Sequence, residues 1–355
     1  MSRRRGAVPW AATSMPMIRR QWCYAMEAAA DLSFEQYRDA LPPGAAPERA
    51  ARLKKIQRLM DKFAVYAETI RTEAQALRTA ELYWVSRDMV DVVLDASKSL
   101  PEWTPEAAMP AATGLLCWAK SAGTVASGVP TQEAVEKDLH NPEVTARPLD
   151  RDIATIVELP WDAIWWWTRP DGLLQLTPAS RAEQNAAVLR MAHATSPLWG
   201  AHTIMVRPDI PRTDEANGTE SAHPFVSALG AAWLLMSQTN VTETRTITGP
   251  PEPRPRPDPV EDTEDTDLAR PPARPSTVTI VDMLKAQTRS RTADSGRTFT
   301  HRFPVSGHWR QQACGPGWSQ RKPRYIGDYL KGPADAPLIA PKTRVHVLRG
   351  KRGAR

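Results

Sequence analysis

The residues best suited to chemistry lie in one basic stretch near the end of the chain. His308 and Arg310 are two positions apart, so their side chains project to the same side if this stretch is extended. An imidazole can move a proton and a guanidinium can stabilise a charged phosphoryl transition state, as metal-independent RNA cleavage requires. The same groups can bind phosphate without catalysis, or His308 can hydrogen-bond a backbone carbonyl. Catalysis by His308 and Arg310 is therefore one hypothesis and phosphate binding is another.

More cations and two tryptophans surround this pair. Trp318 follows a Gly-Pro-Gly turn and could stack on bases, whereas Trp309 alternates with His308 and Arg310 and is expected to pack in the core of a small domain. The residues that we predict to contact nucleic acid are Arg310, Trp318, Arg321, Lys322, Arg324 and Lys331.

No cofactor and no metal site is expected. The histidines and cysteines of this stretch lack the compact ligand spacing of zinc sites, and Cys314 has no Cys-His-Asn arrangement around it that would indicate an activated thiol. The glycine-rich and catalytic motifs of nucleotide hydrolysis, dinucleotide binding, zinc proteolysis and ester hydrolysis do not occur.

The charge of the chain is concentrated in the same region. Residues 285–355 contain 16 Lys and Arg against three carboxylates, a net charge of +13, whereas the whole chain has a net charge of only +6. Such asymmetry indicates an acidic partner at one end of the chain. We expect a nucleic-acid-interacting protein. The alternatives are a toxin-like ribonuclease that uses His308 and Arg310, and a non-enzymatic interaction or assembly protein that binds an acidic protein; the first alternative alone would be an enzyme.

A proline-rich and then acidic segment over residues 249–284 is predicted to be a linker. It contains alternating prolines followed by a run of carboxylates, with few apolar residues to bury. The acidic run could mask part of the basic region. We expect a basic, β-rich domain over 285–355, where short extended runs alternate with glycine turns.

The first part of the chain is predicted to be helical. An apolar stripe with spacings of three and four residues runs from Leu53 to Leu77 and continues, shifted, from Leu82 to Ala96. This pattern predicts a long helix or a helical hairpin over 47–99, and a homodimer through residues 47–98 by coiled-coil packing is an alternative. Residues 1–46 are expected to form a partly disordered N-terminal segment.

Residues 100–248 are predicted to be a central mixed domain with a tryptophan-rich hairpin. Ala163–Thr168 and Leu173–Leu176 are β-prone runs joined by a Pro-Asp-Gly turn. Three consecutive tryptophans alternate between the faces of such a strand, so both faces should be at least partly covered. A strand near Gly114–Trp118 and a helix over 222–240 complete this domain.

Three widely separated cysteines favour a reducing compartment, and no apolar run is long enough to span a membrane. We therefore expect a cytoplasmic protein with no membrane association and an α+β fold.

Three stretches of the chain resemble an uncharacterised family of actinobacterial and actinophage proteins. They are Thr79–Met89, Leu100–Trp118 and Val305–Leu338, and the last is the most specific. The family carries an aromatic where this chain has Ala313-Cys314, which argues further against a catalytic Cys314. The resemblance implies a phage-related or other mobile-element origin and brings no activity or site residues with it.

Overall fold

The chain folds as two compact units, Met1–Met283 and Leu284–Arg355. The computed structural model describes residues 9–39, 64–65, 67–130, 154–188, 196–201, 203–212, 224–248, 276–284, 300–333 and 336–338. Both helices and a mixed sheet are present, so the fold is α+β. None of the helices in these ranges combines the length and the apolar character needed to cross a bilayer.

The first unit is built on a mixed eight-stranded sheet with the order β7-β6-β5-β2-β1-β10-β9, and β8 pairs with β6. β1 pairs in parallel with β2 and β10, and the other ladders are antiparallel. The strands are β1 (Glu81–Val85), β2 (Thr113–Trp118), β5 (Ala163–Thr168), β6 (Leu174–Arg181), β7 (Leu198–Gly200), β8 (Ile204–Val206), β9 (Thr242–Thr248) and β10 (Thr277–Met283). β3 (Thr124–Pro130) and β4 (Ala154–Pro160) form a separate antiparallel pair.

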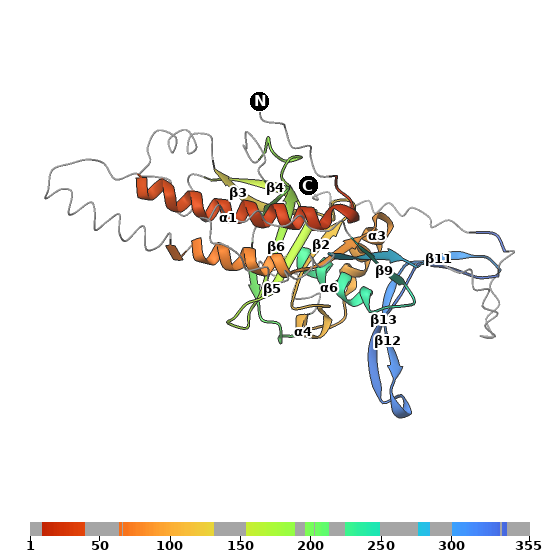
Figure 1. Cartoon of the computed structure of the whole chain (residues 1–355). Coiled ribbons are helices and arrows are strands. Elements are labelled where there is room, and N and C mark those ends of the chain that lie inside the picture. The colour runs from red at the N-terminus through yellow and green to blue at the C-terminus, as the bar shows by residue number, and fades with distance from the viewer. Residues whose placement is uncertain are drawn as a thin grey trace, which may run out of the picture. The chain divides into compact units, whose positions relative to one another are not determined.

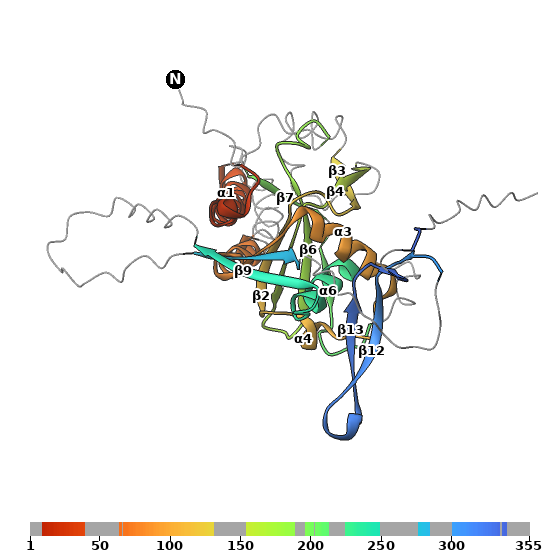
Figure 2. The same ribbon diagram turned by 90° about the vertical axis from the view of Figure 1, so that its right-hand side faces the viewer.

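Helices cover both faces of this sheet (Figures 1 and 2). One face packs against α1 and a helix over residues 67–79, and the other packs against α3 and α6. The named helices are η1 (Ala12–Ser14), α1 (Met15–Asp39), α3 (Arg87–Ala96), η2 (Ser97–Ser99), α4 (Pro105–Ala108) and α6 (Pro224–Met236). The core of the first unit therefore has two layers, one on each side of the sheet.

The tryptophan run of β5 lies at the centre of both layers. Trp165 and Trp167 pack on the α1 side, where Trp165 contacts Trp22 edge-on. Trp166 points to the opposite side and contacts Trp233 of α6. Their exposed fractions are 1%, 0% and 7% for Trp165, Trp166 and Trp167, which confirms the prediction of a hairpin covered on both faces.

Within the segment 1–46 that is predicted to be partly disordered, Met15–Asp39 form the helix α1, and residues 1–8 and 40–46 lie outside the described residues. Pro16 lies in its first turn, where no intrahelical N–H bond is lost. Arg19 interrupts the apolar pattern, but its guanidinium donates to Ala80 O and Ser276 Oγ at the start of β1 and beside β10. A charged residue on an otherwise apolar face therefore concealed the helix.

The predicted helix or hairpin over 47–99 is corrected at Glu81–Val85, which form the buried strand β1. The helix at 67–79 instead pairs with α1, through Arg71 with Asp31 and Arg78 with Glu27. Ala67, Ala74 and Leu77 are buried within the chain, so this part of the stripe does not offer a face for a second copy. The rest of the stripe, over 47–63, lies outside the described residues.

The predicted linker over 249–284 is corrected at its end. Thr277–Met283 form β10, which lies between β1 and β9 in the sheet. Val278 and Val281 are buried in this strand, and its β-branched residues were the available signal. Residues 249–275, with the prolines and the acidic run, lie outside the described residues.

The second unit contains two small antiparallel pairs. β12 (His308–Cys314) pairs with β13 (Gln320–Ile326), and the turn between them contains η5 (Pro316–Trp318). β11 (Phe303–Val305) pairs with β14 (Tyr329–Lys331). Tyr325 is the one buried residue in the described part of this unit. The predicted strand at 345–348 lies outside the described residues.

Replacing Gly114 with alanine should destabilise the first unit by about 1–3 kcal/mol, because overpacking forces side chains or backbone to shift. A Cβ at this position would lie 2.6 Å from Trp166 Cη2. Urea unfolding followed by circular dichroism measures the change. Gly200→Ala is the control, since its Cβ would approach no closer than 3.3 Å, to a Thr177 methyl. Equal losses in the two variants would contradict this account of Trp166 packing.

Candidate nucleic-acid interface

The hairpin formed by β12 and β13 carries most of the residues that the sequence singled out (Figure 1). Gly315 and Gly317 take positive φ values of 76° and 62°, which glycine adopts without a steric penalty. These two residues let the chain reverse within a short turn. The turn fixes the register, so that Cys314 faces Gln320 and every later pair follows from it.

The register gathers three cations on one face of this hairpin. Arg310 lies directly opposite Arg324, and Gln312 lies opposite Lys322. Directly opposed residues share a face, as do residues two positions apart along a strand. We call Arg310, Lys322 and Arg324 the cationic face.

The cationic face is open to solvent and has no counter-charge among the described residues. All three of its side chains are exposed. None of them forms an ion pair within the described part of the chain. Residues 300–333 contain six basic residues and one carboxylate, Asp328, and that carboxylate accepts a hydrogen bond from the Gly307 backbone N–H. The face therefore presents a positive potential that nothing in the described unit neutralises.

The other two predicted cations lie elsewhere in the second unit. Arg321 belongs to β13 but faces the opposite side, because it alternates with Lys322. Lys331 lies in β14, opposite Phe303, in the other pair of strands. Both side chains are exposed. The structure thus unites three of the predicted phosphate contacts and separates two.

His308 lies on the same face as Arg310, as the spacing predicts. Its Nδ1 is 3.1 Å from the Ser306 carbonyl oxygen, which can only accept, so Nδ1 carries the proton. The His308 side chain is exposed, and Nε2 is then the ring nitrogen without a hydrogen in the neutral imidazole. The other described histidine of this unit, His301, contacts Thr300 and lies before β11. Within residues 300–333, therefore, the hairpin face supplies one imidazole and no second one beside it.

The opposite face of the hairpin provides the packing of the unit. Trp309 lies opposite Tyr325, and their rings meet edge-on at 5.2 Å. Tyr325 is 2% exposed and Trp309 is half-buried, in agreement with a packing role for Trp309. Gly307 allows this arrangement, since a Cβ there would lie 2.7 Å from Tyr325 Cζ. One face of the hairpin is thus used for folding and the other is left for contacts with solvent or a ligand.

Trp318 lies in the turn of the hairpin and is 68% exposed. All 13 tryptophans of the chain fall within the described residues, and Trp318 alone is exposed. An exposed tryptophan next to a cationic strand pair is the arrangement found where aromatic rings stack on bases.

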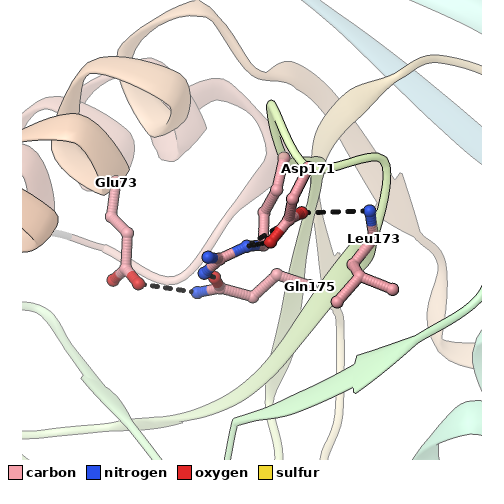
Figure 3. Close-up of polar contacts among 5 residues, drawn as sticks. Glu73, Asp171, Leu173 and Gln175 are labelled. Carbon is pink, nitrogen blue, oxygen red and sulfur yellow. Dashed lines mark hydrogen bonds and ion pairs between the residues drawn. The ribbon is translucent and has the colours of Figure 1, made fainter.

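A polar cluster that the sequence did not indicate lies in the first unit, at the β5–β6 turn (Figure 3). Gln175 is 1% exposed; its Nε2 donates to Glu73 Oε1 at 3.0 Å, and its Oε1 accepts from Arg169 at 3.4 Å. Arg169 also pairs with Asp171, whose second oxygen accepts from Leu173 N–H at 3.1 Å. The buried amide of Gln175 is therefore satisfied by two charged side chains.

The pKa values of the two carboxyl groups of this cluster, Glu73 and Asp171, are shifted in opposite directions. Burial raises the pKa of Glu73, and the contacts with Gln175 and Arg169 offset only part of this effect. The backbone N–H of Leu173, and then Arg169, lower the pKa of Asp171. A carboxyl group with a raised pKa can act in proton transfer. Here, however, Glu73 accepts from Gln175, Gln175 accepts from Arg169, and Arg169 pairs with Asp171, so these polar groups bond to one another. We assign the cluster the structural role of tying the β5–β6 turn to the helix at 67–79.

Among the residues that the structure describes, the other reactive groups do not form a catalytic centre. Cys23 and Cys117 are buried, and burial raises the pKa of Cys23 to about 11 and raises the pKa of Cys117 further, so neither is a ready nucleophile. Cys314 is half-buried on the hairpin. In the part of the chain that the structure describes, no three His, Cys, Asp or Glu side chains gather as metal ligands.

Replacing Glu73 with Gln should leave the hydrogen bond to Gln175 in place and remove a half-buried charge. Because the pKa of Glu73 is raised in the folded state, the folded state binds more protons than the unfolded state. The contribution of Glu73 to the free energy of unfolding therefore falls as the pH rises above the pKa that this carboxyl group has in the unfolded chain. The free energy of unfolding of Glu73→Gln, relative to the parent, should therefore increase from about pH 4 to about pH 7.

Glu73→Leu should instead cost about 1–3 kcal/mol, because the Gln175 amide loses its acceptor. Glu68→Gln, on the same helix, is the control, since the Glu68 side chain is 73% exposed and should change stability little. Urea unfolding across this pH range measures all three variants. A difference between Glu73→Gln and the parent that does not change with pH would contradict the assignment.

A scan against protein-family models, a search of curated proteins and a search of solved structures each found no match to this chain. The resemblance to the actinobacterial and actinophage proteins stays a prediction, and the function of the chain has to be argued from the geometry of the hairpin.

Proposed function

We propose that this protein binds nucleic acid through the cationic face of the β12–β13 hairpin. The observation that carries the proposal is the cross-strand pair Arg310–Arg324. Like charges directly opposite each other in an antiparallel pair destabilise it. The hairpin nevertheless places them together, with Lys322 beside them, and provides no carboxylate to relieve the repulsion within the described residues. A bound polyanion would supply the missing counter-charge.

The chemistry of the cations favours phosphate as that counter-charge. A guanidinium matches phosphate oxygens with two parallel N–H donors, and Lys adds a point charge. Neutralising phosphates also releases condensed counterions, which supplies most of the sequence-independent affinity for nucleic acid. Three exposed cations side by side are enough for weak, salt-sensitive binding, and the remaining basic residues of the second unit can add to it.

The edges of the hairpin argue against the alternative of strand addition by a protein partner. Among the described residues, β12 and β13 form a two-stranded sheet, so each strand has one edge to which no other described strand pairs. Pro323 in β13 has no N–H to offer, and proline on an edge strand hinders pairing with another chain. The face of the hairpin is therefore a better docking surface than its edge, and a charged ligand fits that face better than an apolar one.

The triple variant Arg310→Gln, Lys322→Gln, Arg324→Gln should bind nucleic acid more weakly and with less salt dependence. The slope of log K against log salt should fall by about 2–3, since each lost phosphate contact removes about 0.7–0.9. At about 0.1 M salt the affinity should fall on the order of 100-fold. Fluorescence anisotropy of labelled RNA and DNA oligonucleotides over a range of salt concentrations measures both quantities.

A charge-matched triple variant of the first unit, Arg87→Gln, Lys98→Gln, Arg207→Gln, is the control. These side chains are exposed and lie outside the hairpin. The control should bind nearly as the parent protein does. Failure of the full-length chain to bind either nucleic acid at low salt would overturn the proposal, as would equal losses in the two triple variants. Competition by an acidic polypeptide that matches the oligonucleotide in strength would point to an acidic protein as the partner instead.

A further inference from the structure

We infer that the hairpin tip recognises unpaired bases, so that the ligand is single-stranded nucleic acid and Trp318 is its stacking residue. The inference rests on the proposed function and specifies the substrate class of the same site. It is carried by the backbone of Trp318, by the hydrogen bonds of the turn and by the exposure of the indole ring.

The backbone of Trp318 has a conformation that tryptophan rarely adopts. Its φ is +60°, and it is the one residue other than glycine with positive φ in the described part of the chain. A bulky side chain in this region of φ and ψ is disfavoured, because its Cβ crowds the backbone. Strained residues of this kind persist where the surroundings fix them, and they cluster at ligand-binding positions. Glycine would fit the turn with less strain, so folding alone does not call for tryptophan here.

Hydrogen bonds hold the turn in this conformation. Trp318 N–H donates to Gly315 O at 3.2 Å, and Ser319 N–H donates to Pro316 O at 3.4 Å. The Ser319 hydroxyl donates to the same Pro316 carbonyl at 2.9 Å. Pro316 fixes one further dihedral angle. The turn that holds Trp318 is thus fixed by hydrogen bonds and by Pro316. Binding of a ligand to the Trp318 ring therefore requires little further ordering of the backbone.

The ring itself has no packing role of the kind that the other tryptophans have. It is 68% exposed, whereas the other 12 are buried or half-buried. Water around an exposed indole is released when a flat apolar partner covers the ring, which makes this position favourable for stacking. The only large aromatic surface at the tip therefore faces solvent.

An unpaired base is the partner that fits both the ring and the cations. In a duplex the faces of the bases are already stacked, whereas a single strand can turn its bases out onto aromatic side chains. The cationic face begins at Lys322, four residues beyond Trp318, and continues to Arg324, about 7 Å further along the strand. A single strand could place a base on Trp318 while its backbone follows these cations. The turn residues before Trp318 are Gly315, Pro316 and Gly317, which have no side-chain donors for reading base edges in a groove. The Ser319 hydroxyl that follows already donates to the Pro316 carbonyl.

Binding of the full-length protein to one labelled oligonucleotide, alone and annealed to its complement, tests the inference. Trp318→Ala should weaken binding of the single strand roughly 5- to 150-fold, as loss of one base stack does. Binding of the duplex and the salt slope should stay unchanged. Trp318→Phe should keep most of the affinity for the single strand. Trp318→Gly should lose as much affinity as Trp318→Ala although it relieves the backbone strain, which separates loss of the ring from damage to the turn.

Tyr329→Ala is the matched control, because Tyr329 is an exposed aromatic residue of the same unit that lies in β14. It should bind both ligands as the parent does. Single-strand affinity that is unchanged in Trp318→Ala overturns the inference, and so does an equal loss for the single strand and the duplex, which would indicate a wedge inserted between base pairs. In either case the proposed function stands if the cationic-face variant still lowers affinity and salt slope. Absence of binding to both ligands by the parent protein would overturn the proposed function itself.

Discussion

Burial of β5 on both of its faces is the constraint on which the first unit depends. Trp165 and Trp167 need a layer of helices on one side of the sheet, and Trp166 needs a layer on the other. A sheet with only one covered face would leave a large aromatic side chain in water. α1 and the helix at 67–79 supply the layer on one side, and α3 and α6 supply the layer on the other. Gly114 and Gly230 supply the space that the rings of Trp166 and Trp103 occupy.

The two units follow different physical rules. The first has a large aromatic core, and its charged groups are mostly paired or on the surface. The second has one buried side chain, Tyr325, among its described residues and is held largely by backbone pairing. Small two-stranded units have little independent stability. Most of the described side chains of the second unit, including those of the cationic face, are therefore not needed for a core.

The sequence predicted well where one local signal dominated. The Pro-Asp-Gly turn and the alternation of Trp165, Trp166 and Trp167 gave the hairpin, and the spacing of His308 and Arg310 placed them on one face. It failed where distant partners decide the structure. Arg19 reads as surface in isolation but donates to Ala80 O, and β10 follows a proline-rich segment yet pairs with β1. The opposition of Arg310 and Arg324 depends on the register of the turn, and the positive φ of Trp318 had no signal beyond the flanking glycines.

The opposition of Arg310 and Arg324 also gives ionic strength two contrary effects on the same residues. Salt screens the repulsion between the two guanidinium groups, so it tightens the free hairpin. Salt also weakens the attraction of that hairpin for a polyanion. High salt thus stabilises the free hairpin most and lets it bind a polyanion least. In dilute salt, a bound polyanion stabilises the hairpin most. Folding of the hairpin and occupancy of its cationic face are in this sense a single linked equilibrium.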